Sequence, residues 1–223
     1  MLHLIKFFID FFLHLDVHLG QAIKDYGTYI YFMLFAIIFC ETGLVVTPIL
    51  PGDSLLFAAG TFAALGDLNV WLLYGIICVA AVLGDTVNYW VGHIIGPRAF
   101  TMDTWFLRKK YLDQTHEFFE RYGGKTIIIA RFIPIVRTFA PFVAGVGSMT
   151  YLRFLSYNVI GGVMWVTVCI FAGYFFGNIS IVRKNFTIVI LGIIFVSILP
   201  TIIEYIRQRY FVKKPPASKK TEK

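Results

Sequence analysis

Long apolar runs dominate the pattern of hydrophobic and polar positions along this chain. Four of them approach or exceed the roughly 20 residues that an α-helix needs to cross ~30 Å of hydrocarbon. They cover residues 26–47, 70–95, 151–177 and 186–206. The pattern lacks the short alternating strands of a membrane β-barrel, so we expect an all-α fold, a polytopic membrane helical bundle.

The first 25 residues have an amphipathic pattern instead. Polar side chains recur every three to four positions on one helical face, opposite a face rich in Phe and Leu. These polar residues are His3, Lys6, Asp10, His14, His18 and Gln21. No small-residue cleavage site follows, so we do not expect a signal peptide. We predict that residues 1–25 form a helix lying in the membrane interface, with a first transmembrane span as the alternative.

Two apolar segments, residues 41–66 and 125–149, are interrupted by prolines and glycines. The interrupting residues of interest are Pro48, Pro51, Gly52, Pro134, Pro141 and Gly145. They divide each segment into halves of about 10 to 14 residues, which are too short to cross a membrane singly. We therefore predict two re-entrant hairpins, each followed by a long transmembrane helix.

The order of hairpin and long helix occurs twice, which suggests an internal repeat. A shift of 85 residues aligns Phe57 with Phe142, Ala59 with Ala144, Gly60 with Gly145, Tyr89 with Tyr174 and Gly92 with Gly177. Because one long helix crosses the membrane between the hairpins, they would open on opposite faces. Inverted repeats of this kind form the substrate sites of many secondary transporters.

Composition and charge agree with this topology. Hydrophobic residues make up 58% of the chain, charged residues 15%, and the mean hydropathy is +0.74. Lys and Arg concentrate in the loop at 96–125 and in the tail at 207–223, and the positive-inside rule places both in the cytoplasm. Residues 26–206 then form the membrane domain. Orientation and anionic lipids account for the net charge of +7, so no nucleic-acid partner is expected.

The three cysteines, Cys40, Cys78 and Cys169, lie far apart within apolar runs. This spacing is typical of small packing residues. We expect no metal site, no disulfide and no cofactor.

Charged residues inside the broken segments cost at least ~2.5–3.5 kcal/mol each at bilayer depth, so they need a partner or a function. Glu41 ends an apolar run and has no capping role, so we expect it to be protonated or paired with an arginine and to be functional. Asp53 stands near the start of a predicted short helix at 54–65. It either caps free backbone N–H groups or acts as a functional carboxylate, and the two roles are compatible.

Arg131 and Arg137 flank Pro134, which prevents a straight helix. They would snorkel to the interface, neutralise Glu41 and Asp53 as structural ion pairs, or bind an anion. A guanidinium is permanently charged and presents a planar fork of donors that suits phosphate. We favour an anion site beside carboxylates that take up protons.

Two weaker features lie outside the hairpins. Asp85 and Asn88 share one helix face at i and i+3, where Asp85 would either take part in proton transfer or make a hydrogen-bonded contact between helices. Residues 111–124 predict a cytoplasmic amphipathic helix that ends at Gly123-Gly124.

The charged elements together resemble the bacterial DedA family, whose domain is shared with eukaryotic VTT-domain lipid scramblases. The matching elements are Glu41 followed by PILPGD at 48–53, then Arg131-x-x-Pro134-x-x-Arg137, then Gly145-x-x-x-Met149. The resemblance covers about residues 35–177. Ile129 is a departure, because the family commonly has an aromatic residue at that position.

The resemblance implies a protein of the bacterial inner membrane that depends on the proton-motive force. Its implied partners are protons and membrane lipids, and its implied cargo is a polyprenyl phosphate carrier lipid, notably undecaprenyl phosphate. Glu41 and Asp53 would be the proton-coupling carboxylates, with Asp85 as a further candidate. Arg131 and Arg137 would bind the phosphate.

Other functions predict different features. A lipid-phosphate phosphatase of the acid-phosphatase type needs two histidines near a basic residue, and neither hairpin contains a histidine, so we do not expect an enzyme. A proton-coupled antiporter for small cations or drugs would bind its cargo with Glu41, Asp53 and Asp85. A scaffold would alter membrane properties without moving lipid. The sequence leaves the oligomeric state open.

Overall fold

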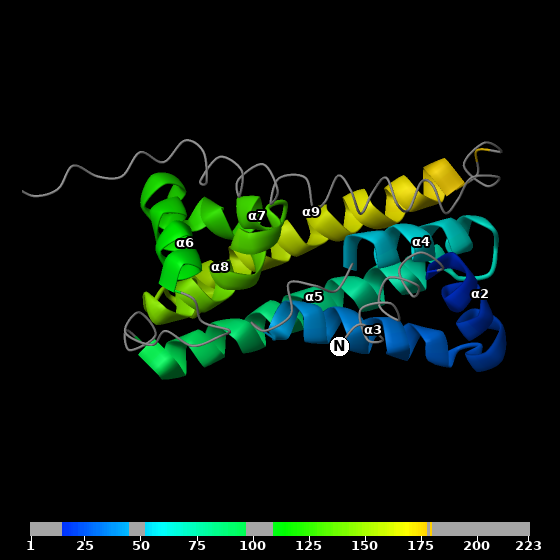
Figure 1. The fold of residues 1–223 in the computed structure, drawn as a ribbon, viewed down its shortest axis with the longest axis horizontal. Helices are drawn as coiled ribbons and strands as arrows, with labels where there is room; N and C mark the ends of the chain where they lie inside the picture. The colour runs from blue at the N-terminus through cyan, green and yellow to red at the C-terminus, as the bar shows by residue number, and fades with distance from the viewer. Residues whose placement is uncertain (1–14, 45–51, 97–108, 178, 180–223) are drawn as a thin grey trace, which may run out of the picture.

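The computed structural model describes residues 15–44, 52–96, 109–177 and 179, and these ranges contain helices and no strand (Figure 1). The helices are α2 (Leu15–Tyr26), α3 (Tyr29–Gly43), α4 (Gly52–Ala64), α5 (Val70–Ile95), α6 (Lys109–Tyr122), α7 (Thr126–Ala130), α8 (Pro134–Val146) and α9 (Tyr151–Gly177), with a 3-10 turn at Gly123–Lys125. The predicted all-α class is confirmed for this part of the chain.

Two described helices are long and apolar enough to cross a membrane, α5 and, over Tyr151–Phe176, α9. Both have the bounds that the apolar runs predict. The start of α5 is set by Asn69, whose side-chain Oδ1 accepts hydrogen bonds from the backbone N–H groups of Trp71 (3.0 Å) and Leu72 (3.1 Å). Its end is set by Gly96, whose φ of +62° a residue with a side chain rarely adopts.

The apolar run at 26–47 forms a shorter helix than predicted. Helix α3 has 15 residues, which corresponds to about 22 Å and falls short of a straight span. Several predictions lie outside the described residues: Pro48, Pro51, the run at 186–206, the tail at 207–223 and residues 1–14 of the N-terminal helix. The rest of that helix is α2, which packs on α4, with Gly20 against Phe62.

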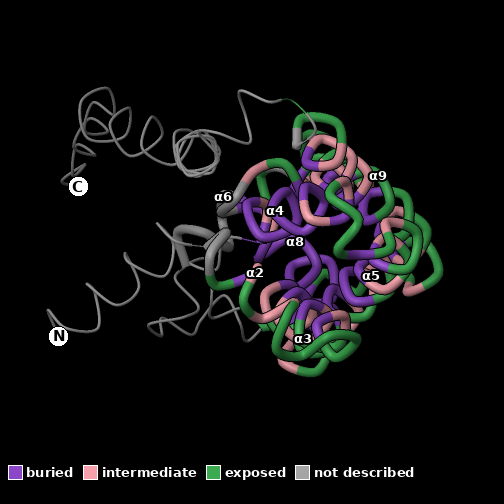
Figure 2. Tube along the Cα trace, turned by 90° about the vertical axis from the view of Figure 1, so that its right-hand side faces the viewer, coloured by how far each residue is buried: buried purple, intermediate pink, exposed green. Residues whose placement is uncertain are grey.

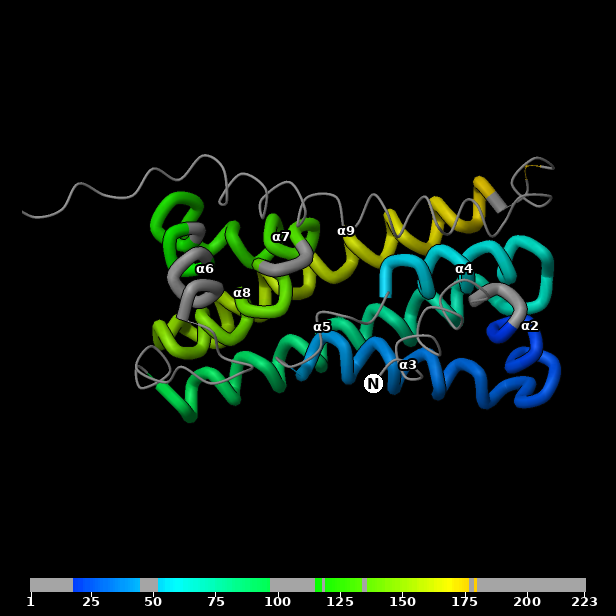
Figure 3. Tube along the Cα trace, in the orientation of Figure 1, coloured from blue at the N-terminus to red at the C-terminus, as the bar shows by residue number. Residues whose placement is uncertain are grey.

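The short helices α4 and α8 each have 13 residues, the length predicted for half of an interrupted segment. Figure 2 shows both as largely buried within the bundle. Each packs against the long helix of the other half of the chain, α4 on α9 and α8 on α5 (Figure 3). The two halves are therefore interlocked.

Matched glycines allow these close contacts. An added Cβ on Gly60 of α4 would meet the backbone carbonyl of Ile170 in α9, and one on Gly145 of α8 would meet that of Tyr89 in α5. The reciprocal contacts use Gly173 against the Phe57 carbonyl and Gly92 against the Phe142 carbonyl. The same contact thus occurs once in each half, as an internal repeat requires.

The predicted alignment needs one correction. Gly60 and Gly145 are equivalent, as the 85-residue shift predicts, but Gly92 makes the contact equivalent to that of Gly173 rather than Gly177. Gly92 follows Gly60 by 32 residues and Gly173 follows Gly145 by 28. The difference of four residues is about one helical turn, so the identical residue lies one turn beyond the contact.

The second interrupted segment is divided unequally. Its first half is the five-residue α7, shorter than predicted, and a turn at Arg131-Phe132 separates it from α8. Pro134 is the first residue of α8, where its missing N–H costs nothing, and the preceding Ile133 is extended. Before this segment, α6 ends at Gly123, which has a φ of +59°, as predicted.

Replacing Gly60 by Ala is expected to lower the free energy of unfolding by about 1–3 kcal/mol, because overpacking against a backbone carbonyl cannot be relieved by side-chain rotation. Gly145→Ala should have a similar effect. The matched control is Gly75→Ala, since Gly75 is exposed on α5 and an added Cβ meets no atom within 4 Å. Thermal unfolding in detergent, followed by size-exclusion chromatography, measures the effect, and equal stability of all three variants would contradict the interlocked packing.

Candidate functional site

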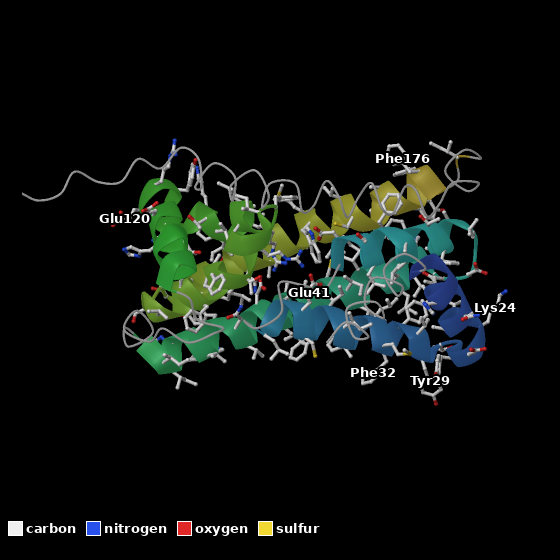
Figure 4. The ribbon with its side chains drawn as sticks, in the orientation of Figure 1. Lys24, Tyr29, Phe32, Glu41, Glu120 and Phe176 are labelled. Carbon is white, nitrogen blue, oxygen red and sulfur yellow. The ribbon has the colours of Figure 1, made fainter. Side chains whose placement is uncertain are left out.

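The predicted charged residues lie at helix ends. Glu41 is in the last turn of α3, Asp53 in the first turn of α4, and Arg137 in the first turn of α8. Glu41 lies midway along the bundle (Figure 4). The end of a helix carries partial negative charge and its start carries partial positive charge. Glu41 and Arg137 therefore each occupy an unfavourable helix end, which an opposite charge nearby compensates.

Arg137 pairs with both carboxylates, which is one of the alternatives that the sequence left open for the arginines. Its Nη1 donates to Asp53 Oδ1 at 3.0 Å, and its Nη2 lies 3.4 Å from Glu41 Oε1. The side chains of Glu41 and Arg137 are 9% and 12% exposed, but that of Asp53 is 34% exposed. Asp53 is thus the most exposed member of this cluster.

The Glu41 carboxylate lies against the start of α4. A Cβ on Gly52 would collide with its oxygens, so only glycine leaves room for the carboxylate there. Within the part of the chain that the structure describes, Glu41 Oε2 and Arg137 Nη2 are buried side-chain atoms without a hydrogen-bond partner. The cluster therefore has hydrogen-bonding capacity that its own members do not use.

Asp53 is the second residue of α4, and its side chain bonds to other side chains. Besides Arg137, the indole Nε1 of Trp165 in α9 donates to Asp53 Oδ1 at 2.8 Å. The Arg137 Cζ atom also lies 4.1 Å from the centre of the Trp165 ring, a cation–π contact. The sequence analysis missed Trp165. A tryptophan in the middle of an apolar helix was the available signal, because a buried indole N–H needs an acceptor.

Arg131 lies in a second cluster. Its Nη2 donates to Asp85 Oδ2 and to Asn158 Oδ1, each at 2.6 Å, and the residue is only 4% exposed. Gly161 and Gly162 of α9 lie against its side chain and leave space for it. The structure thus pairs Arg131 with Asp85 rather than with Glu41 or Asp53.

Asn88 shares a face of α5 with Asp85 and bonds to the backbone beside Glu41 and Arg137. It follows Asp85 by nearly one turn of α5, is fully buried, and its Nδ2 donates to the carbonyls of Thr42 (3.3 Å) and Thr138 (2.9 Å). These residues directly follow Glu41 and Arg137 in the chain. The face shared by Asp85 and Asn88 therefore makes contacts between helices, one of the two predicted roles, and the proton role of Asp85 stays a prediction.

Two further predicted hairpin residues, Pro141 and Gly145, pack against neighbouring parts of the bundle. Pro141 is buried inside α8, and Gly145 forms the close contact with α5 described above. Among the residues described, no group of three or more His, Cys, Asp or Glu side chains is placed to hold a metal ion.

Comparisons with known proteins identify the family. The VTT domain matches residues 50–175, more than half of the chain. Protein DedA of Escherichia coli (strain K12) is 56% identical over 209 residues, which are 92% of this chain and 95% of that protein. This chain belongs to the DedA family.

Other DedA family relatives are more distant. An uncharacterized membrane protein of Mycobacterium leprae (strain TN) is 46% identical over 168 residues, 75% of each chain. The inner membrane protein YqjA of Escherichia coli (strain K12) is 35% identical over 157 residues, 70% of this chain and 71% of that protein. No solved structure matches. The family resemblance is confirmed, and this DedA family chain is a membrane protein.

Asp85→Asn is expected to destabilise the protein by about 3–5 kcal/mol, because it leaves the buried Arg131 charge without its counterion. Adding Arg131→Gln removes that charge, so the double variant should be more stable than Asp85→Asn alone. The matched control is Asp67→Asn, an exposed residue between α4 and α5. Unfolding in detergent measures these variants and Arg131→Gln alone, and a loss in the double variant equal to the sum of the two single losses would contradict the buried pair.

Proposed function

We propose that this DedA family protein translocates a polyprenyl phosphate across the bacterial inner membrane, driven by the proton-motive force. Undecaprenyl phosphate is the expected lipid. The observation that carries the proposal is the position of Arg137, a largely buried guanidinium at the start of a helix, between two carboxylates from another hairpin. A guanidinium and a helix start both attract phosphate.

The proposal includes two inverted re-entrant hairpins. In support, α4 and α8 are each about 20 Å long by their residue count, too short to cross, and each packs on the long helix of the opposite half. The helices then enter from opposite sides, and their starts lie near mid-membrane. Residues 26–206 form the membrane domain, with the loop at 96–125 and the tail at 207–223 in the cytoplasm.

The charges at the site suggest how protons and phosphate are coupled. With Glu41 and Asp53 ionised, the cluster formed with Arg137 has a net charge of about −1 and repels phosphate. With both carboxyls protonated, its net charge is about +1, and the Arg137 fork becomes available for the head group. The Arg131–Asp85 pair adds nothing to either sum. Proton uptake therefore changes the sign of the site, and loss of the protons would release the lipid.

Residues other than Arg137 would assist the proposed transport. Asp53, the most exposed member of the cluster, is placed to receive protons first, and Glu41 lies deeper against Gly52. Arg131, also predicted as a phosphate ligand, forms a pair of no net charge with Asp85 in the second cluster, and the two would assist by holding α7 against the long helices. The polyprenyl chain would stay in the membrane lipid while only the head group enters.

The same charge count supports a second candidate. A site with a net charge of about −1 also suits a small cation, as in a proton-coupled antiporter that binds its cargo with Glu41, Asp53 and Asp85. In that case Arg137 would be structural. The two candidates differ in what Arg137 must do, which can be tested directly.

Glu41→Gln is expected to abolish polyprenyl phosphate translocation driven by a pH difference, because the amide keeps the shape of the side chain but cannot take up a proton. The effect is measured as the translocation of a fluorescent polyprenyl phosphate across the membrane of proteoliposomes, with and without an imposed pH difference. Asp67→Asn serves as the control carboxylate outside the site and should behave as the unchanged protein. Full activity of Glu41→Gln would remove Glu41 from the coupling.

Arg137→Lys should reduce translocation by about tenfold or more, the factor to which ~1.4 kcal/mol of lost binding corresponds, because a point charge cannot replace the two-pronged hold on phosphate. The protein should still fold, since lysine can pair with Glu41 and Asp53. The same proteoliposomes give the rate, and size-exclusion chromatography gives the folded amount. Unchanged lipid translocation would favour a structural Arg137, and proton-coupled uptake of a small cation would establish the antiporter.

A further inference from the structure

Trp165 is the member of the Arg137 cluster that comes from neither hairpin. It lies in α9, is 2% exposed, and contacts both partners of the more exposed of the two ion pairs that Arg137 makes. Its indole N–H donates to the Asp53 oxygen that also accepts from Arg137, and its ring faces the Arg137 guanidinium. One side chain therefore holds both ends of a pair that, under the proposed function, must open to admit a phosphate.

These two contacts do not depend on the ion pair itself. An indole N–H can donate to a carboxylate and also, though less strongly, to the carbonyl oxygen of a neutral carboxyl group. The attraction between an aromatic face and a guanidinium needs no carboxylate. The contacts of Trp165 can therefore persist in a state in which Arg137 has left Asp53.

The packing around Trp165 favours its staying with Asp53. Along the same helix, Ile170 and Gly173 make the two close backbone contacts with α4, the helix that carries Asp53. Arg137 reaches Trp165 from α8, which packs on α5 instead. Asp53 and Trp165 thus belong to one tightly packed pair of helices, and Arg137 belongs to the other.

We propose that Trp165 is a positioning residue, which keeps Asp53 and Arg137 within reach of each other while the head group occupies the site. This inference rests on the proposed lipid transport. The N–H group holds Asp53 for the return of its partner, and the ring face orients Arg137 toward the incoming phosphate. The two parts of the indole therefore have separable effects.

Two substitutions distinguish the effect of the indole N–H group from that of the ring face. Trp165→Phe keeps an aromatic face and loses the N–H, so the maximal translocation rate should fall by about threefold to tenfold, the scale of one hydrogen bond to an uncharged carboxyl group, with little change in the half-saturating lipid concentration. Trp165→Leu loses both contacts, so its half-saturating concentration should also rise by about threefold to tenfold, the scale of one cation–π contact. Trp71→Phe, an exposed tryptophan of α5, is the matched control.

The rates are measured in proteoliposomes over a range of polyprenyl phosphate concentrations and divided by the amount of folded protein. A residue that only fills space predicts that both Trp165 variants regain normal parameters after this correction. That result, or equal changes of both parameters in the two variants, would overturn the proposal.

A second measurement needs no lipid and separates this inference from the proposed function. In a protein whose other tryptophans, Trp71, Trp90 and Trp105, are replaced by Phe, the emission of Trp165 reports its own surroundings. Asp53→Asn and Arg137→Gln should each change that emission, and Asp67→Asn should not. A response without polyprenyl phosphate translocation would refute the proposed cargo and leave only the contact of Trp165 with the Asp53–Arg137 pair. No response to either substitution would refute the role of Trp165, whichever molecule is carried.

Discussion

A permanent positive charge in the middle of the bundle is the constraint on which the rest of this structure depends. Arg137 cannot become neutral by losing a proton, so it needs negative partners where water is scarce. Glu41 and Asp53 provide them only because α3 ends and α4 begins beside the start of α8. Continuous helices through the same volume would leave no helix ends there. The interruptions in the chain are thus a condition for the site.

The glycine contacts make this meeting of helix ends possible. Two short helices converge in the bundle only if each approaches a long helix more closely than side chains allow, and Gly60 and Gly145 permit that approach. Because each short helix packs on the long helix of the other half, neither half can complete its packing alone. A movement of α4 relative to α8 would involve α9 and α5 as well. The interlocked halves therefore join the geometry of the site to the arrangement of the whole bundle.

Sequence reasoning predicted what depends on local pattern. The bounds of α5 and α9 follow from apolar runs of sufficient length, and the link between Arg137 and the first hairpin follows from the high cost of buried charge. The partner of Arg131 could not be predicted, because it depends on which helix faces meet. Arg131 is separated by 46 residues from Asp85 and by 27 from Asn158, and the three come together only through the packing of α5, α7 and α9. The contact between Trp165 and Asp53 could not be predicted for the same reason, because it also depends on which helix faces meet.

The surroundings of the two arginines differ, and the difference favours a structural role for Arg131 and a binding role for Arg137. Arg131 has one carboxylate and one amide at 2.6 Å, lies on two glycines of α9, and forms a pair with no net charge that is almost closed to solvent. Arg137 lies between two carboxylates, one of which is a third exposed, so the net charge of its cluster would change sign if both carboxyls took up protons. A neutral, enclosed pair has little reason to exchange partners, because any new partner would have to offset the loss of two short hydrogen bonds. An excess of negative charge next to an accessible carboxylate favours exchange. This contrast supports Arg137 as the residue that meets the cargo and Arg131 as the residue that holds α7 against the long helices.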